Sequence, residues 1–252
     1  MTDLERLTAY CDERTRRAEV PDFPPAHNGL QLANEGPVTR VGAAVDAGEV
    51  PIRMAIERGI DFLIVHHGLY WNPPTPLTGS AYRKIRAAME AGLAVYSSHL
   101  PLDCHPEIGN NALLAGLLEL RETGRFLPYE GTPIGLLTAG CHDRDLLRER
   151  LEKLFPGGVT AIEAGPHQPE PIGILTGSGA SAVDAMGAPA GPSTLITGEL
   201  KQHHFNLAQE ERLNLYCCGH YRTEVFGVSA LAAEVAGKFG LEWEFLDTGC
   251  PL

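Results

Sequence analysis

Two adjacent histidines, His66 and His67, follow the most apolar short segment of the chain, Ile60–Val65. The length and composition of that segment predict a buried strand. Open α/β sheets bind their ligands at the carboxyl ends of strands, where these two imidazoles should lie. Neighbouring side chains on a strand point to opposite faces, so the rings diverge unless the chain turns at Gly68, and diverging donors suit two metal ions. The alternative is a structural pair, with one histidine buried and the other exposed.

A second polar group, Ser97–Asp103, follows another apolar strand, which we predict over residues 93–97. If both strands belong to one parallel sheet, His99 and Asp103 should lie at the same edge as His66. The Asp103 carboxylate offers a hard oxygen ligand. The alternative is that Asp103 is an ordinary cap or turn residue.

A third group, Gly219–Glu224, opens the last long helix of the chain. His220 and Glu224 are four residues apart, so on a helix they share one face. If His220 still lies in the loop, the two side chains can converge over the helix start, where the helix dipole favours a carboxylate. A simple capping arrangement is the alternative.

Together the three groups offer three imidazoles and two carboxylates, more ligands than a single zinc ion requires. One potentially bridging carboxylate suits a pair of first-row ions about 3.5–4 Å apart. Mixed nitrogen and oxygen donors fit Zn, Mn, Fe, Co or Ni without choosing among them. The predicted metal ligands are His66, His67, Asp103, His220 and Glu224.

The elements that must position these residues alternate between strands and helices along the first half of the chain. This alternation predicts an α/β fold with a mainly parallel sheet flanked by helices. The middle of the chain changes character, which places a smaller α+β domain at residues 125–194, inserted in a metal-binding α/β domain of residues 1–124 and 195–252. A stiff loop with Pro73, Pro74 and Pro76, and a linker or surface loop over residues 187–192, complete the predicted organisation.

Composition narrows the classes of function. The formal net charge of −12 argues against a nucleic-acid partner, because binding phosphates requires a basic surface. Six scattered cysteines with no CxxC pair indicate free thiols in a reducing compartment. With neither a signal peptide nor a membrane-length apolar run, the chain is expected to be cytoplasmic.

Five motifs, in order along nearly the whole chain, resemble those of the NIF-three-like, or YbgI-like, dinuclear-metal-centre family. They are Asn28–Gln31, His66–Gly68, Ser98–Asp103 followed by Gly109–Asn111, Thr197–Glu199, and Gly219–Glu224. The resemblance implies a two-domain fold, a toroidal homohexamer and a two-metal site facing the central cavity. It implies the same five ligands, with Glu224 as the bridge.

Two departures from the family pattern concern substrate contacts. The family's Pro-Leu-Ile/Leu-Phe after the histidine pair is replaced by Gly68–Trp71, and its Ser-x-His-Thr-Asn-Leu-Asp run lacks the Thr and the Asn here. Tyr70 and Trp71 can stack on a planar substrate, although a hexamer contact explains them equally well. His99 is a further candidate contact.

Two more histidines, His203 and His204, follow the Thr197–Glu199 motif. They are candidates for forming hydrogen bonds to the metal ligands, or for lining the central cavity of the implied hexamer. The alternative is a solvated helix start.

The leading hypothesis from the sequence is a metal-dependent hydrolase of a small molecule. Members of the family are often described as type-2 GTP cyclohydrolases, which suggests a nucleotide, but no guanine or triphosphate site is visible in the sequence. The competing hypothesis is a non-enzymatic metal-binding scaffold or regulator that forms a ring.

Overall fold

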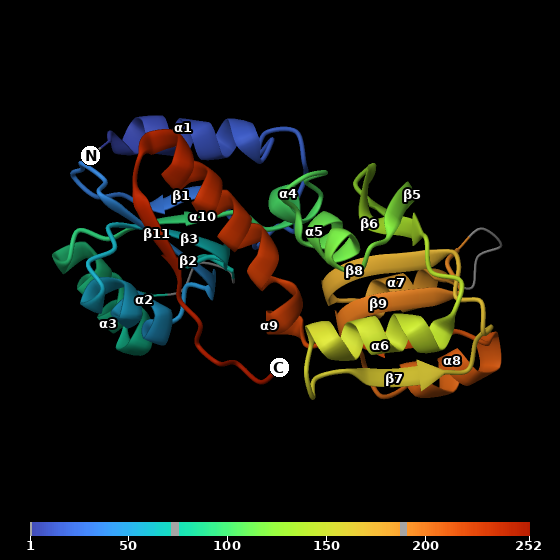
Figure 1. Ribbon diagram of the computed structural model, residues 1–252. Coiled ribbons are helices and arrows are strands. Elements are labelled where there is room, and N and C mark those ends of the chain that lie inside the picture. The colour runs from blue at the N-terminus through green and yellow to red at the C-terminus, as the bar shows by residue number, and fades with distance from the viewer. Residues whose placement is uncertain (1, 72–75, 187–190) are drawn as a thin grey trace. The chain divides into compact units, whose positions relative to one another are not determined.

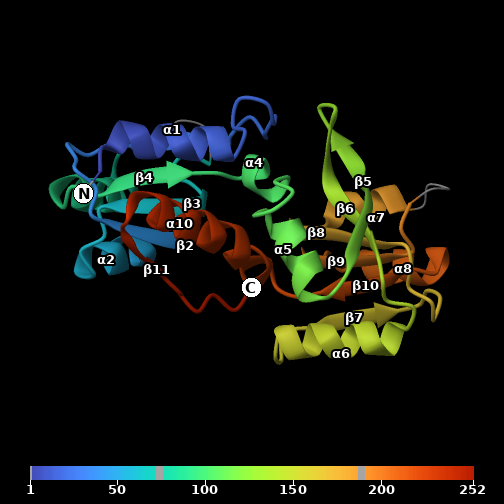
Figure 2. The ribbon, with the colours of Figure 1, turned by 45° about the horizontal axis from the view of Figure 1, so that its top comes forward.

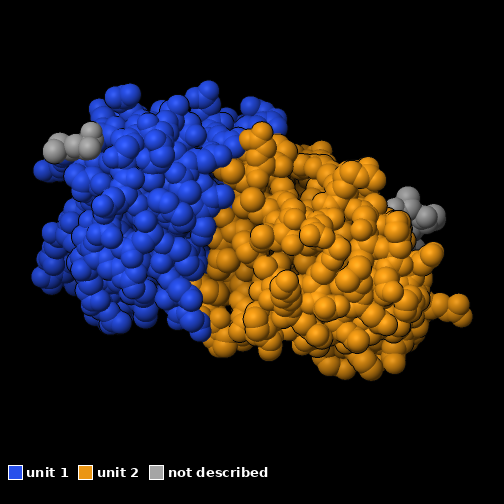
Figure 3. Space-filling view, in the orientation of Figure 1, with its two compact units in different colours: residues 1–102, 227–249 blue, residues 103–226, 250–252 orange. Residues whose placement is uncertain are grey.

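The computed structural model describes residues 2–71, 76–186 and 191–252. Pro73 and Pro74 of the predicted stiff loop, and residues 187–190 of the predicted linker or surface loop, lie outside these ranges. The chain divides into two compact units, coloured separately in Figure 3. Unit 1 comprises residues 1–102 and 227–249, and unit 2 comprises residues 103–226 and 250–252.

Unit 1 contains a five-stranded sheet in the order β1-β4-β3-β2-β11. Strands β2, β3, β4 and β11 run parallel, while β1 pairs antiparallel with β4 at the edge. The strands are β1 (Gly29–Leu32), β2 (Arg40–Asp46), β3 (Phe62–His67), β4 (Ala94–Ser97) and β11 (Glu242–Phe245). Because β3 and β4 are parallel and Val65 pairs with Ser97, the residues that follow both strands emerge at one edge.

Helices cover both faces of this sheet (Figures 1 and 2). On one face, α2 (Glu49–Glu57) and α3 (Gly79–Glu90) contribute Ile52 and Ala88 to a core with Leu63 of β3. On the other, α1 (Leu4–Arg14) and α10 (Val225–Phe239) are joined by the Arg14–Glu234 ion pair. Burying apolar side chains on both faces explains why β3 is a continuous hydrophobic run.

Unit 2 contains a six-stranded sheet in the order β5-β6-β8-β9-β10-β7. Only β8, β9 and β10 are mutually parallel, and the remaining pairs are antiparallel. The strands are β5 (Arg121–Tyr129), β6 (Thr132–Ala139), β7 (Thr160–Glu163), β8 (Ile172–Ser178), β9 (Thr194–Glu199) and β10 (Asn214–Cys217). The three parallel strands end together, which brings three loops to one edge.

The core of unit 2 lies between this sheet and two helices that pack on one of its faces, α5 (Asn110–Leu117) and α6 (Arg144–Leu154). The shorter helices of the unit are α7 (Ala180–Met186), α8 (His204–Glu211) and α9 (His220–Thr223), and α4 (Leu100–Asp103) crosses the boundary between the units.

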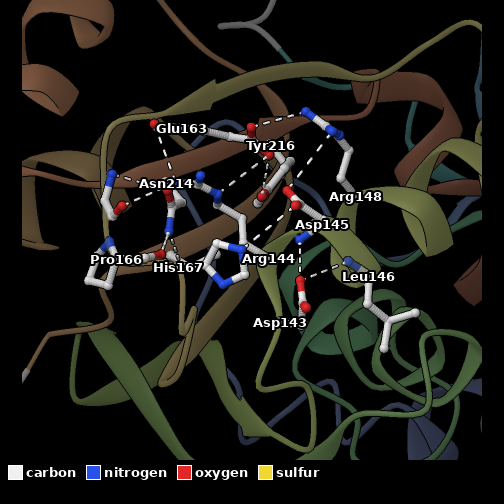
Figure 4. Close-up of polar contacts among 12 residues, drawn as sticks. Asp143, Arg144, Asp145, Leu146, Arg148, Glu163, Pro166, His167, Asn214 and Tyr216 are labelled. Carbon is white, nitrogen blue, oxygen red and sulfur yellow. Dashed lines mark hydrogen bonds and ion pairs between the residues drawn. The ribbon is translucent and has the colours of Figure 1, made fainter.

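A polar network fastens the edge strand β7 to α6 and β10, as Figure 4 shows. The Glu163 carboxylate accepts a hydrogen bond from the Tyr216 hydroxyl at 3.0 Å and pairs with Arg148 at 3.0 Å. Burial, together with Glu163, raises the pKa of Tyr216. The ordinary role of such a satisfied network is structural.

The α/β class is confirmed, but the chain forms two mixed sheets, and the strands within residues 195–217 do not join the mainly parallel sheet of the first 124 residues as predicted. Strand β9 pairs with β8 and β10 pairs with β9 in the second sheet, so His220 follows a strand of a different sheet from His66. The compact units also differ from the predicted domains in where residues 103–124, 195–226 and 250–252 belong. Which division marks independently folding domains stays a prediction. No helix in the described part of the chain is long and apolar enough to cross a membrane.

Candidate functional site

His66 and His67 occupy the last two positions of β3. The His66 side chain is buried, and its Nδ1–H donates to the Ser98 carbonyl at 3.0 Å. The Nδ1–H of His67 donates to Oδ1 of Asp46, at the end of β2, at 2.9 Å. Instead of diverging, the two rings have centroids 4.9 Å apart. Each ring is therefore fixed through Nδ1, which leaves Nε2 with its lone pair.

The turn after the pair depends on a close approach by Gln31. Its Oε1 accepts a hydrogen bond from the Leu69 amide at 2.6 Å. A Cβ added at Gly68 would lie 2.2 Å from Nε2 of Gln31. Only glycine leaves room for this contact, so the Asn28–Gln31 motif and Gly68 belong to one local structure.

His99 brings a third imidazole to the same edge of the unit 1 sheet, as the sequence predicted. Its ring centroid lies 4.7 Å from that of His66 and 5.6 Å from that of His67. One ring nitrogen from each of the three histidines lies within 4.8 Å of the others. The Nδ1–H of His99 donates to Oδ1 of Asp22 at 2.8 Å.

Asp22 is buried and receives two further hydrogen bonds, from Nδ2 of Asn28 at 2.8 Å and from the Leu100 amide at 2.9 Å. Burial alone would raise the pKa of Asp22, but the hydrogen bonds from His99, Asn28 and Leu100 outweigh it and lower the pKa. Asp22 therefore stays an anion that fixes the tautomer of His99.

Trp71 packs against these imidazoles, whereas Tyr70 does not. The Trp71 ring centroid lies 4.6 Å from that of His99 and 5.1 Å from that of His67, edge-on to both. The exposed Tyr70 ring instead meets His27, with a centroid distance of 6.1 Å. Of the two aromatic candidates, Trp71 is the one beside the histidines.

In unit 2, His220 and Glu224 converge as their spacing predicted. The one-turn helix α9 ends at Thr223, and Oε1 of the buried Glu224 lies 3.2 Å from Nε2 of His220. The other nitrogen, Nδ1, lies 2.8 Å from Oε2 of Glu199, at the end of β9. The hydrogen bond with Glu224 raises the pKa of His220 to about 9, with burial opposing and Glu199 adding to the effect. The protonated imidazole of His220 therefore lies between the carboxylates of Glu199 and Glu224.

Two glycines, Gly177 and Gly198, allow the backbone to pack directly against the segment that holds His220 and Glu224. A Cβ at Gly177, near the end of β8, would lie 2.1 Å from Oε1 of Glu224, and one at Gly198, near the end of β9, would lie 2.6 Å from Oγ1 of Thr223. The Gly177 amide donates to the same hydroxyl at 3.0 Å. The two glycines therefore let the ends of β8 and β9 approach α9.

Asp103, also in unit 2, is held by a neighbouring amide. Its Oδ1 accepts a hydrogen bond from Nδ2 of Asn110, the first residue of α5, at 2.7 Å. Both side chains are buried. Asn110, from the Gly109–Asn111 motif, thus orients a carboxylate.

The second histidine pair, His203 and His204, differs from the first in the hydrogen bonding of its rings. His204 is fully buried, which excludes a solvated helix start for this residue, while His203 is exposed. Nδ1 of His204 accepts a hydrogen bond from the Lys201 amide at 3.1 Å, so the proton of the neutral ring lies on Nε2. Burial, next to His203, lowers the pKa of His204. Although Asp184 lies near both rings, this tautomer does not offer Nε2 to a metal.

Sequence reasoning missed the residues that orient the imidazoles. Asp46 ends a strand beside β3, so the argument used for Asp103 would have found it. Asp22 lies in an irregular proline-rich segment with no pattern to mark it. Glu199 belongs to the Thr197–Glu199 motif, but its role in orienting His220 was not predicted.

Comparisons with known proteins agree with the motifs. The family model described as Duf34/NIF3 (NGG1p interacting factor 3) matches residues 11–251. A Deinococcus radiodurans protein is 39% identical over 247 residues, covering 96% of this chain and 92% of the relative. A Halobacterium salinarum protein is 36% identical over 250 residues, covering 97% of each. Both relatives are named GTP cyclohydrolase 1 type 2 homolog.

Solved structures give the same result. A crystal structure of a Thermus thermophilus protein matches with a TM-score of 0.87 at 36% identity, and the ybgI protein, of unknown function, with 0.90 at 28%. Each comparison covers 100% of both chains. The fold is therefore NIF3-like, and the family resemblance inferred from the motifs is confirmed. With nearly its whole length matched by the family model, the chain belongs to the Duf34/NIF3 family.

Proposed function

We propose that this chain binds two divalent metal ions and acts as a metal-dependent hydrolase on a small molecule. Imidazole and carboxylate donors together suit Zn, Mn, Fe, Co or Ni. Glu224 is the proposed bridge between the ions. The full proposed ligand set is His66, His67, Asp103, His220 and Glu224.

The observation that carries this proposal is how the imidazoles are held. Nδ1 of His66, His67 and His220 each faces an oxygen, from the Ser98 carbonyl, Asp46 and Glu199 respectively. Metal-binding histidines almost always donate their second ring N–H in this way, which fixes the ring and raises the basicity of the ligating nitrogen.

The proposed carboxylate ligands support the same function. Glu224 and Asp103 are both buried, and burying a carboxylate is costly unless a cation or hydrogen bonds compensate. Asn110 supplies one hydrogen bond to Asp103, and the proton on His220 serves Glu224. A metal ion would take over the compensating charge from that proton.

A bound divalent pair lowers the pKa of water and stabilises the negative charge that develops during hydrolysis. The chain itself contributes the orientation of the donors. His66 and His67 supply neutral nitrogens, and Trp71 packs against His67, which restricts the approach of solvent to that ring. Glu199 orients His220.

A nucleotide is the first substrate class that we propose to test. The curated relatives are named after a GTP cyclohydrolase, and a divalent pair would supply the positive charge that an acidic chain lacks for phosphates. A purine ring is also planar, which suits edge-on or stacked packing with Trp71.

The test begins with reconstitution of purified protein with each candidate metal, followed by elemental analysis. We expect two equivalents per chain. The loaded protein is then assayed against GTP, other nucleotides and phosphoesters, with the metal-free protein as reference. Glu224→Gln and Asp103→Asn should abolish turnover, whereas Glu211→Gln, an exposed glutamate on α8, should not change it.

The outcomes separate the two hypotheses about function. Less than one equivalent of every metal would refute the metal site. Full loading without turnover of any substrate would favour a metal-binding scaffold, and turnover unaffected by Glu224→Gln would refute the proposed mechanism. The toroidal homohexamer is proposed from the family resemblance, and light scattering that finds a monomer at all concentrations would contradict it.

A further inference from the structure

Both the ring and the backbone of His99 are fixed by hydrogen bonds. Its Nδ1–H donates to Asp22 at 2.8 Å, and its backbone amide donates to Oδ1 of Asn28 at 2.8 Å. Asn28 in turn donates to the second carboxylate oxygen of Asp22. Ring and backbone are thus fixed by one connected group of buried or partly buried residues, which leaves the ring a single orientation.

The same contacts determine what His99 offers to its surroundings. With Nδ1–H committed to Asp22, the neutral ring carries its lone pair on Nε2 and can accept a hydrogen bond. The neighbours of the ring are His66, His67 and Trp71, with centroid distances of 4.7, 5.6 and 4.6 Å. An acceptor in a fixed orientation therefore lies beside the proposed metal-binding pair.

A purely structural role does not require this arrangement. Asn28 and Leu100 already anchor the loop to Asp22 through an amide and a backbone N–H. A phenyl ring in place of the imidazole would fill the same volume without burying another polar group, which costs free energy unless it is used. The histidine is explained if Nε2 meets a donor that the described residues of the chain do not provide.

We infer that His99 is a contact residue for the molecule bound at the His66–His67 pair, and that Asp22 is its positioning residue. The inference rests on the proposed metal-binding function and adds a property of the ligand. The ligand carries an N–H or O–H donor close to the oxygen atoms that approach the metal, as an amide, a hydroxamate or a protonated ring nitrogen does.

Two probes that differ in a single donor test this inference. Acetohydroxamate binds divalent ions through its two oxygens and carries an N–H, which N-methylacetohydroxamate lacks. Both are titrated into Co²⁺-loaded protein, and binding is followed by the visible spectrum of the ion. Wild-type protein should prefer acetohydroxamate by about tenfold, the worth of one good hydrogen bond.

In His99→Phe this preference should fall to about twofold or less, with Co²⁺ affinity unchanged. Asp22→Asn should reduce the preference as well, because one amide oxygen cannot accept all the hydrogen bonds that the carboxylate receives. His27→Phe, at a unit 1 histidine in contact with Tyr70, is the control and should retain the wild-type preference.

Three results would overturn the inference. An unchanged preference in His99→Phe would show that Nε2 does not meet the probe. A loss of Co²⁺ affinity of more than about 100-fold in His99→Phe would make His99 a metal ligand instead. Absence of Co²⁺ binding to the wild-type protein would refute the proposed function and this inference with it, whereas the first two results leave the proposed function standing.

Discussion

The proposed ligands in unit 1 and those in unit 2 are prepared for a metal ion in opposite ways. In unit 1, Nδ1 of His66 and Nδ1 of His67 each face an oxygen, and in the neutral tautomer this places the lone pair on Nε2. In unit 2, His220 lies between two carboxylates, Glu199 and Glu224, and its pKa is raised to about 9. One group therefore offers lone pairs, whereas the other holds a proton.

This difference teaches what each group contributes to binding. Neutral imidazoles give selectivity for first-row metals but no net charge. Buried carboxylates give the charge, yet they must be neutralised when no metal is present, and the proton on His220 does this for Glu224. Metal binding at unit 2 should therefore release a proton below about pH 9.

The largest effect should come from removing the proposed bridge. Glu224→Gln should lower metal affinity by more than about 100-fold and prevent loading of both ions, because it removes both charge and a shared oxygen. His67→Gln should leave one equivalent bound. Elemental analysis after equilibrium dialysis measures both. Equal losses in the two variants would break the distinction between the two groups.

The second effect concerns the stability of the metal-free protein. The folded-state pKa of His220 lies above its ordinary value near 6.5, so its stabilising contribution is complete below pH 6.5 and is lost as the pH rises through about 9. The ring is partly exposed, so we expect a loss of about 2 kcal/mol over this interval rather than the full linkage value.

Urea unfolding in the presence of a chelator, at pH 6.5 and pH 9, measures this loss. His220→Gln should remove this part of the pH dependence. His142→Gln, at an exposed histidine of the same unit, should retain it. A wild-type protein whose stability does not fall between these pH values would contradict a proton shared by His220 and Glu224.

The chemistry of the two groups was easier to predict than their placement. His66, His67 and His99 could be assigned to one edge because strands β3 and β4 are consecutive and parallel. Nothing in the local sequence says that β10 pairs with β9 and β7, since pairing partners depend on distant segments. Asp22 escaped prediction for the same reason, because its partner His99 lies 77 positions away.

A third effect tests how unit 2 holds its carboxylate. Gly177→Ala places a methyl group 2.1 Å from Oε1 of Glu224, whereas Gly157→Ala meets no atom within 4 Å. The two glycines have nearly equal positive φ, 66° and 68°, so both variants bear the same backbone strain of about 1–2 kcal/mol. Gly177→Ala should lose about 2 kcal/mol more, or displace Glu224 and weaken metal binding.

Thermal or urea unfolding, together with metal titration, separates these two results for Gly177→Ala. Matching stability and matching metal affinity in the two alanine variants would show that the close approach of the end of β8 is not needed. No equivalent test exists at His66, because its fixed partner is the Ser98 carbonyl of the main chain.

The smallest effect should come from the two carboxylates that contact Nδ1 of a proposed ligand, Asp46 for His67 and Glu199 for His220. Both are about half exposed, at 52% and 53%, so replacing either with its amide should lower metal affinity by about tenfold, the low end for such partners.

Glu199→Gln also lowers the pKa of His220, which weakens the competition between the proton and the metal ion. At pH 7 its loss should therefore be smaller than that of Asp46→Asn, and most of this difference should disappear at pH 9, where only about half of His220 is still protonated. Metal titrations of both variants at the two pH values decide this, and a Glu199→Gln loss that is the same at pH 7 and pH 9 would mean that the proton on His220 does not compete with the metal.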